Sequence, residues 1–281
     1  MNTITTLLKR NSFLLLCIVI LIGGPQDIFA QEESLMGKRN EIGFKIGYSF
    51  ASVHEERFSS VSKNVIMPSA TLFFSKQGLE SKHEWALSYR GTAKSAGGSL
   101  LNFKVFHPEF QYSYLRKIGN QWIGAFINSS NLIVIPDSPL GGFSNNPVSY
   151  TLANSFGLKV EKNHALFNNE KHRLELQSSM QMALLSHVVR PAYAHPYPED
   201  FLKESTFNPT REGMPSSVMS SGKIRSIKDY QSFTVKLGLG YYFNNNFKMN
   251  LSYTAQLESN TASHNSRIVS NDLHVGMAFV Y

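Results

Sequence analysis

Apolar and polar residues alternate along most of the chain after about residue 40. The clearest segment runs from Ile42 to Phe50, where Ile, Phe, Ile, Tyr and Phe alternate with Gly, Lys, Gly and Ser. Successive side chains of a β-strand point to opposite faces, so this segment has one apolar face and one polar or small face. No stretch past residue 40 has a convincing helical period. The pattern therefore predicts an all-β fold.

Ten such segments are predicted, and the links between them differ in length. The strands are expected at about 42–50, 66–74, 85–90, 106–114, 122–127, 148–160, 174–184, 233–243, 247–257 and 273–281. Short links are expected at 76–82, 117–121, 161–171 and 244–246, whereas the link from His187 to Tyr230 is long. Short turns that alternate with longer loops are typical of a membrane barrel. We predict a closed antiparallel up-and-down transmembrane β-barrel of about ten strands, with 8 or 12 as alternatives.

The apolar faces are expected to meet lipid. Aromatic residues gather at the strand ends of these faces, as at Tyr241 with Phe243 and at Phe279 with Tyr281. Such residues form the interfacial girdles of membrane barrels. In the seventh segment the apolar face is formed by Leu174, Leu176, Met180, Met182 and Leu184, opposite Glu175, Gln177, Ser179 and Gln181. An even strand count puts both ends of the barrel on the periplasmic side.

The first thirty residues have the pattern of a secretory signal peptide. Lys9 and Arg10 precede the apolar run Phe13–Ile22, and Ala30 precedes Gln31. A run of ten residues is too short for a transmembrane helix, which needs about 20. We predict a cleaved signal peptide at 1–30, a periplasmic segment at 31–40 and the barrel at 41–281.

Composition and charge narrow the function classes further. The chain has 281 residues, of which 42% are hydrophobic and 17% charged, and its net charge is +7. No run of Lys and Arg exceeds two residues, so nucleic-acid binding is not expected. The single cysteine, Cys17, lies in the apolar run of the leader, which leaves no disulfide or thiol chemistry in the mature chain.

The last nine residues resemble the closing strand of bacterial outer-membrane β-barrels. Leu273, Val275, Met277, Phe279 and Tyr281 share one face of this segment and end in an aromatic residue. In that family such a strand is the assembly signal, which implies the barrel-assembly machinery as a partner during biogenesis. The leader ending in Ala30 is similar to those of Bacteroidota outer-membrane barrels. The resemblance implies integral insertion in the outer membrane, with its lipid as a further partner, and identifies no functional subfamily.

Charged residues on the polar faces are expected to point into a narrow lumen. They are Lys45, Glu84, Arg90, Glu109, Lys159, Glu175, Lys236 and Lys248. Opposite charges in a tight lumen should pair. Two readings follow: a polar plug that holds the barrel in shape, which we favour, or a narrow selective path past these charges.

The long loop after the seventh strand is a candidate contact surface. It combines three prolines with Arg190, Tyr193, His195, Tyr197 and Phe201. Loops of this length without secondary structure usually have a role. These side chains could meet a ligand or a protein partner in the membrane, or the loop could fold into the mouth of the barrel.

Catalytic and metal sites have little support in the sequence. His264-Asn265-Ser266 superficially resembles the His-x-Ser element of lipid A deacylases, but Arg267 follows where that family has Asn. No acidic residue follows Asp272 to complete a triad. No catalytic, metal or cofactor site is expected. We predict a non-enzymatic membrane-embedded binding, transport or accessory component, with a narrow solute channel or a lipid-acting hydrolase as alternatives.

Overall fold

The structure of the chain is a computed structural model that describes residues 39–56, 62–92, 103–136, 149–169, 171–189, 222–243, 246–261 and 265–281. The predicted signal peptide and most of the predicted periplasmic segment lie outside these ranges. No helix that could cross a membrane occurs in the described part of the chain.

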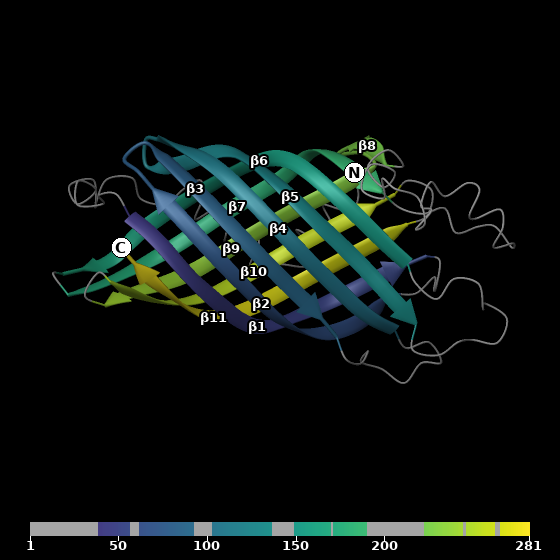
Figure 1. The fold of residues 1–281 in the computed structure, drawn as a ribbon, viewed down its shortest axis with the longest axis horizontal. Coiled ribbons are helices and arrows are strands. Elements are labelled where there is room, and N and C mark those ends of the chain that lie inside the picture. Colours follow the sequence, from purple (N-terminus) through teal and green to yellow (C-terminus); the bar gives the residue numbers. More distant parts are fainter. Residues whose placement is uncertain are drawn as a thin grey trace, which may run out of the picture.

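The described residues form eleven β-strands (Figure 1). Their bounds are β1 Arg39–Glu55, β2 Lys63–Gln77, β3 Ser81–Gly91, β4 Phe103–Ile118, β5 Gln121–Pro136, β6 Ser149–Asn168, β7 His172–Val189, β8 Lys223–Ser226, β9 Tyr230–Phe243, β10 Phe247–Asn260 and β11 Ser266–Val280.

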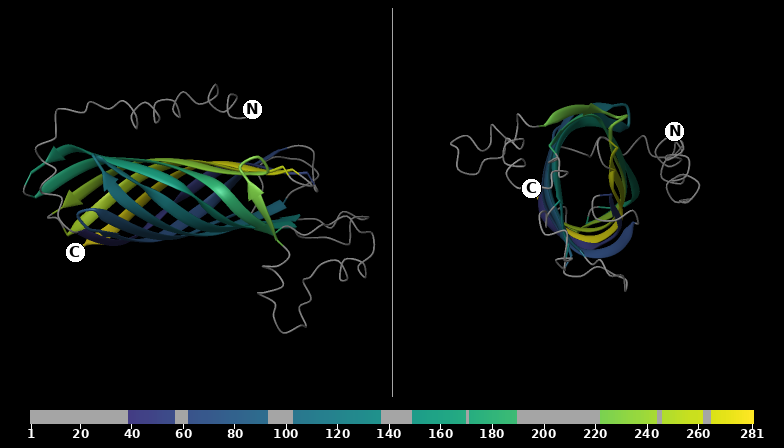
Figure 2. Two further views of the ribbon diagram at one scale, coloured as in Figure 1. Left: turned by 90° about the horizontal axis from the view of Figure 1, so that it is seen from above. Right: turned by 90° about the vertical axis from the view of Figure 1, so that its right-hand side faces the viewer.

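Ten of these strands close into an antiparallel barrel. Neighbours in sequence pair with each other, with β9 next to β7, and the ring is closed by β1 with β11. The short strand β8 lies outside this ring and pairs with β7 from Leu185 to Val188. The closed ten-stranded fold confirms the prediction. Viewed along its axis the barrel is flattened to an oval (Figure 2).

The two ends of the barrel differ. One end carries the start of β1, the end of β11 and the tight turns after β2, β4, β6 and β9, and we call it the turn end. The opposite end, which carries the other links, is called the loop end. Strand β2 and the other long strands run between these ends at a marked tilt to the barrel axis (Figure 1).

The outer surface near the turn end is apolar. Along β1 the side chains of Ile42, Phe44, Ile46, Tyr48 and Phe50 are each between 45% and 59% exposed. The strand rises about 27 Å over this stretch at ~3.4 Å per residue. At a tilt of ~35–45° this is a height of about 19–22 Å, which covers most of the ~25 Å apolar band of membrane barrels. A surface of this kind is stable in lipid and not in water.

Aromatic rings line the outer surface at the turn end. Phe74, Trp85 and Tyr112 are register partners on β2, β3 and β4, with successive ring centroids 5.1 and 5.3 Å apart. On the other side of β1, Phe247 and Phe279 meet edge to face with centroids 5.9 Å apart. Phe279 is one of the strand-end aromatic residues named from the sequence, and rings gathered at one end of a barrel are typical of interfacial girdles.

The two faces of the wall exchange character at the loop end. On β1 the apolar residues change phase after Phe50, because Ala51 and Val53 are buried inside while Ser52 and His54 point outward. The inward apolar residues of this level form the apolar plug: Ala51, Val53, Val65, Met67, Val105, Leu132, Val134 and Ile268, with Ala153, Val188 and Tyr230 on β6, β7 and β9. At this level the interior of the barrel is apolar, whereas the outer positions Ser52 and His54 of β1 are polar.

A β-bulge in β7 lies at the predicted end of this strand. The register with β6 shifts between Phe156 and Gly157, so that Leu184 is the extra residue. Leu185 is 51% exposed beyond the bulge and Ser186 is buried. Because an added residue reverses the two faces of a strand, the residues beyond Leu184 continue β7 in the opposite phase to Leu174–Met182.

Several strands are longer than their sequence pattern indicated. β6 continues to Asn168 through residues expected to form a link, and β7 continues to Val189 into the expected loop. β1 begins at Arg39, two residues before the predicted start of the barrel, because Asn40 exchanges backbone hydrogen bonds with Tyr281. β8 was not predicted at all. These extensions carry charged residues into the lumen.

The orientation of the faces can be tested with two matched arginine substitutions. Leu251 is 46% exposed within the apolar band, whereas Leu79 is 66% exposed in the turn between β2 and β3. We expect Leu251→Arg to lower the free energy of unfolding from lipid vesicles by about 2–4 kcal/mol, because the charge would lie near the bilayer centre. Leu79→Arg should be close to neutral in the same urea titration. Equal effects of the two substitutions would contradict the assigned faces.

A second pair of variants tests the close strand contact at the bulge. A Cβ atom on Gly157 would lie 2.1 Å from the Met182 carbonyl oxygen, whereas one on Gly238 would meet nothing closer than 3.6 Å. Gly157→Ala should lower the free energy of unfolding by about 1–3 kcal/mol, because backbone atoms would have to move. Gly238→Ala should change it little. A neutral Gly157→Ala variant would show that the strands do not approach so closely.

Candidate functional site: the lumen

Ion pairs fill the lumen near the turn end, where they join β1, β3, β6, β7 and β10. Glu41 contacts Arg39 at 2.8 Å and Lys248 at 3.0 Å, and Tyr242 donates a hydrogen bond of 3.1 Å to the same carboxylate. The members of this turn-end charge cluster are Arg39, Glu41, Lys82, Glu84, Lys159, Glu161, Arg173, Glu175, Tyr242 and Lys248.

Two lysines and two glutamates of this cluster alternate across the gap between β3 and β6. Lys82 pairs with Glu161 and with Glu84, and Lys159 pairs with both glutamates in turn. Each charge therefore has two opposite neighbours. A closed ring of this kind offsets the desolvation of all four groups.

A second set of charges, the loop-end charge cluster, lies between the cavity and the apolar plug. Arg90 pairs with Asp272 at 3.1 Å and with Glu109 at 3.4 Å. Glu258 lies 3.6 Å from His107 and accepts hydrogen bonds from Tyr230 and Gln256. Asn128 donates a bond of 2.9 Å to Glu109. These contacts define the cluster as Arg90, His107, Glu109, Asn128, Tyr230, Gln256, Glu258 and Asp272.

Many of these contacts cross the lumen between strands that are not neighbours. Lys82 and Glu161 join β3 to β6, and Arg90 and Asp272 join β3 to β11. His107 and Glu258 join β4 to β10, which lie on opposite sides of the ring. Gln111 and Gln181 add a reciprocal amide pair between β4 and β7, at 3.0 and 3.2 Å. The flattened section of the barrel brings these side chains within reach of each other.

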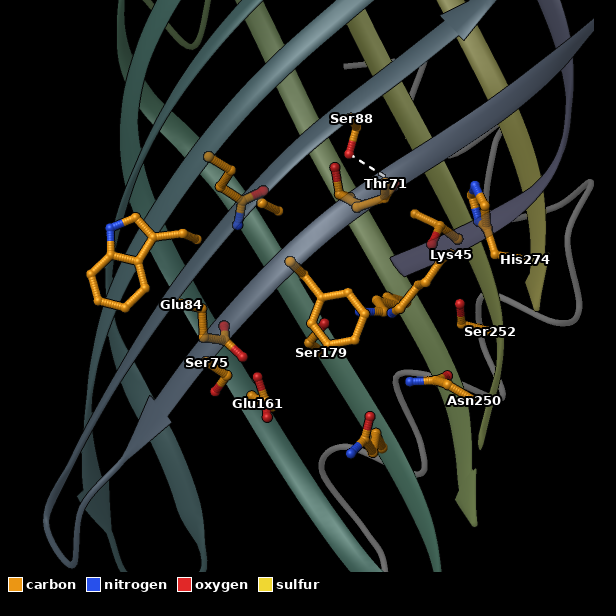
Figure 3. A pocket seen from close by; sticks show the side chains of 18 of the residues that line it. Lys45, Thr71, Ser75, Glu84, Ser88, Glu161, Ser179, Asn250, Ser252 and His274 are labelled. Atoms are coloured by element: carbon orange, nitrogen blue, oxygen red, sulfur yellow. Dashed lines mark hydrogen bonds between the residues drawn. The ribbon is translucent and has the colours of Figure 1, made fainter. Parts of the chain in front are cut away.

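A polar cavity of about 190 Å³ touches both charge clusters. Its wall carries the hydroxyl groups of Thr71, Ser88, Ser252 and Thr254, and the ring of His274. Figure 3 shows Lys45, Thr71, Ser252 and His274 around this space.

The eight predicted lumen charges lie inside the barrel. Lys45, Glu84, Arg90, Glu109, Lys159, Lys236 and Lys248 line the cavity, and Glu175 is fully buried beside Arg173 and Arg39. Six of the eight belong to the two charge clusters, whereas Lys45 and Lys236 belong to neither.

Further charged residues of the lumen were missed by the sequence reasoning, among them Arg39, Glu41, Lys82, Glu161, Arg173, Glu258 and Asp272. Each lies in the inward phase of its strand, near or beyond an end that the apolar pattern set too short. Extending the alternation by one or two polar positions at each strand end would have found most of them.

The described residues offer no complete catalytic or metal constellation. Ser69 Oγ lies 2.8 Å from His274 Nε2 inside the lumen, and no carboxylate hydrogen bond to the other ring nitrogen is found in the described ranges. Ser266 of the hydrolase alternative is buried at the loop end, and His264 lies outside the described residues. No group of three potential metal ligands occurs in the described part of the chain.

The other predicted contact residues are placed as follows. Arg190, Tyr193, His195, Tyr197 and Phe201 lie outside the described residues, so the contact role of the long loop stays a prediction. The residues of the predicted assembly signal, Leu273, Val275, Met277, Phe279 and Tyr281, are all exposed on the outer surface of the closing strand or at its end.

Comparison with known proteins identifies no family for this chain. No protein-family model and no curated protein matches the chain. Among solved structures, the attachment invasion locus protein Ail of Yersinia pestis is 10% identical, with 88% of this chain and 100% of that chain covered and a TM-score of 0.27. The translocator domain of autotransporter NalP from Neisseria meningitidis is 9% identical, with 85% and 88% covered and a TM-score of 0.41.

A third similar structure is an enzyme. The outer membrane protease OmpT from Escherichia coli is 10% identical, with 87% of this chain and 96% of that chain covered and a TM-score of 0.43. The names of the three proteins indicate different functions, and the barrel of this chain is established by its own strand pairing. Function must therefore be argued from the lumen of this chain.

Removal of Arg90 tests whether the loop-end charge cluster holds the barrel together. Arg90→Met leaves the buried carboxylates of Glu109 and Asp272 without their cation. We expect the free energy of unfolding to fall by about 3–5 kcal/mol, as measured by urea titration in vesicles. Arg116→Met, at an exposed position near the turn end, is the matched control. Adding Glu109→Gln and Asp272→Asn to Arg90→Met should restore much of the loss, and an unchanged stability of Arg90→Met would contradict the account.

Proposed function

We propose that this chain is an integral outer-membrane β-barrel that acts as a non-enzymatic binding or accessory component with a closed lumen. The observation that carries the proposal is the set of ion pairs that cross the lumen, such as Lys82 with Glu161 and Arg90 with Asp272. With the lumen occupied in this way, the outer surface and the loop end are available for contact with other molecules.

The apolar plug supports the same proposal. Eight strands contribute inward apolar side chains at the loop end, including Val53, Val65 and Val134, which are at most 1% exposed. An apolar constriction excludes hydrated ions. A solute would have to pass this plug as well as two charge clusters, which disfavours the alternative of a narrow channel.

The outer-membrane location belongs to this proposal. It is supported by the apolar outer band, by the aromatic girdle at the turn end and by the expected signal peptide and closing-strand signal. We place the turn end in the periplasm and the loop end outside, so that the contact candidates of the long loop face the exterior. A Bacteroidota-type origin is part of the same proposal and is supported by the resemblance of the leader alone.

An enzymatic role has less support. Catalysis on a lipid needs a nucleophile, a base and an orienting group that reach the membrane surface. Ser69 and His274 face the interior, and Ser266 is buried beneath the loop end. The lipid-acting hydrolase is therefore the weaker alternative.

Conductance of the purified barrel in planar lipid bilayers tests the closed lumen. We expect no stable unitary current for the unmodified protein, because the cross-lumen pairs and the apolar plug leave no continuous water path. Insertion must be verified on the same sample by the heat-dependent change in gel mobility. A reproducible unitary current from inserted unmodified protein would overturn the proposal in favour of the channel.

A further inference from the structure

Two lysines of the central cavity have no carboxylate partner. Lys45 is 7% exposed, and Lys236 is half-buried on β9. Within the described ranges no carboxylate oxygen lies within ion-pair distance of either ammonium group. Both lysines line the same cavity of about 190 Å³.

The nearby carboxylates are already engaged. Glu41 is held by Arg39, Lys248 and Tyr242 at the turn end, and Asp272 is held by Arg90 at the loop end. The turn-end charge cluster holds five cations and four carboxylates, and the loop-end charge cluster holds one cation and three carboxylates. Together with Lys45 and Lys236 these residues make eight cations and seven carboxylates, so the lumen keeps an excess of one positive charge.

A glycine on the neighbouring strand β11 leaves space for the side chain of Lys45. Gly276 is its register partner on β11, and a Cβ atom there would lie 2.6 Å from the Cγ atom of Lys45. The lysine stem thus occupies the space that a side chain at position 276 would fill. Its ammonium lies 5.0 Å from the centroid of the Phe73 ring, within the range of a cation–π contact.

Hydrogen-bond donors surround the same space. Thr71 and Ser88 lie 3.0 Å apart through their hydroxyl oxygens, and Ser252 and Thr254 add two more hydroxyl groups to the wall. Ammonium groups with hydroxyl donors suit the oxygens of a phosphate or carboxylate group. Buried cations without a counter-charge are unfavourable, so an anion in this place would offset their desolvation.

We propose that the central cavity binds one small oxyanion, a phosphate or a small carboxylate, between Lys45 and Lys236. The lumen is separated from the lipid by the barrel wall, so the ligand is a free anion rather than the headgroup of a membrane lipid. Exchange is slow, because both ends of the cavity are bounded by ion pairs. The bound anion completes the electrostatic balance of the lumen.

The test compares thermal unfolding after refolding with different anions at equal ionic strength. The unmodified barrel is refolded into detergent with phosphate, with succinate or with chloride alone, and unfolding is followed by the emission of its two tryptophans. We expect the unfolding temperature to rise with the concentration of at least one oxyanion relative to chloride. The comparison of phosphate with succinate identifies which oxyanion chemistry the cavity prefers.

Matched double variants test whether the oxyanion-dependent rise in unfolding temperature depends on Lys45 and Lys236. Lys45→Met/Lys236→Met should lose the oxyanion-dependent rise while folding at least as well in chloride, since the unpaired buried charges are gone. Lys76→Met/Lys171→Met removes two exposed lysines near the turn end and should keep the rise. Lys45→Gln/Lys236→Gln serves as a second loss variant if the methionine variant fails to fold.

Equilibrium dialysis with the oxyanion that raises the unfolding temperature gives the number of anions bound per barrel. One anion bound per barrel, lost in the cavity variants and kept in the Lys76/Lys171 control, is the expected result. Equal stabilisation by chloride and both oxyanions, or an oxyanion effect that survives in the cavity variants, would overturn the proposal. This outcome is independent of the conductance result, because a closed barrel can lack the site and a channel can contain it.

Discussion

The hydrogen bonds of the peptide backbone impose the constraint on which the rest of this structure depends. In lipid a strand edge leaves its N–H and C=O groups without partners, so a sheet in the membrane has to close. β1 achieves this by pairing with β11 from Glu41 to Glu55, and β6 and β7 complete the other side of the ring. Closure of only ten strands leaves a narrow interior. Polar side chains turned away from lipid must therefore satisfy one another across that interior.

The two faces of the barrel wall exchange character along the barrel axis. Ile42 to Phe50 present apolar side chains to lipid while Lys45 and its polar neighbours face inward. Beyond Phe50 the phase is reversed, and Val53 joins the apolar plug while His54 faces outward. The interior is thus layered from ion pairs at the turn end, through a polar cavity and a second charge cluster, to an apolar layer at the loop end. In each layer, side chains from different parts of the ring contact one another, and these contacts stabilise the barrel wall.

Period-two alternation was sufficient to predict the strand order, the closed barrel and the inward placement of residues such as Lys45 and Lys248. The alternation did not predict strand residues beyond the end of an apolar stripe, or positions where the apolar face changes sides. Glu161 was assigned to a link because its neighbourhood lacks an apolar stripe, although β6 continues through it. The exchange of faces after Phe50 hid the apolar plug, and the bulge at Leu184 reversed the end of β7.

The pairing of lumen charges was beyond sequence reasoning for another reason. Arg90 and Asp272 are separated by most of the chain, and their contact depends on barrel closure, strand register and the flattened section together. A one-dimensional pattern indicates that a side chain points inward, but not which side chain it meets. For the same reason, the lack of a carboxylate beside Lys45 and Lys236 became visible only in three dimensions.

The accessibility of a cysteine in the lumen shows whether ion pairs between distant strands close it. The described barrel contains no cysteine, so Ser252→Cys places one thiol at a cavity position that is 2% exposed, and Leu79→Cys places one at an exposed turn. The rate of reaction with a neutral, membrane-impermeant maleimide is measured for both in lipid vesicles. The account predicts that the thiol at 252 reacts far more slowly than the thiol at 79, and that replacing Lys82 and Arg90 by Ser accelerates it. Equal rates at the two positions in the otherwise unmodified barrel would contradict the closed lumen.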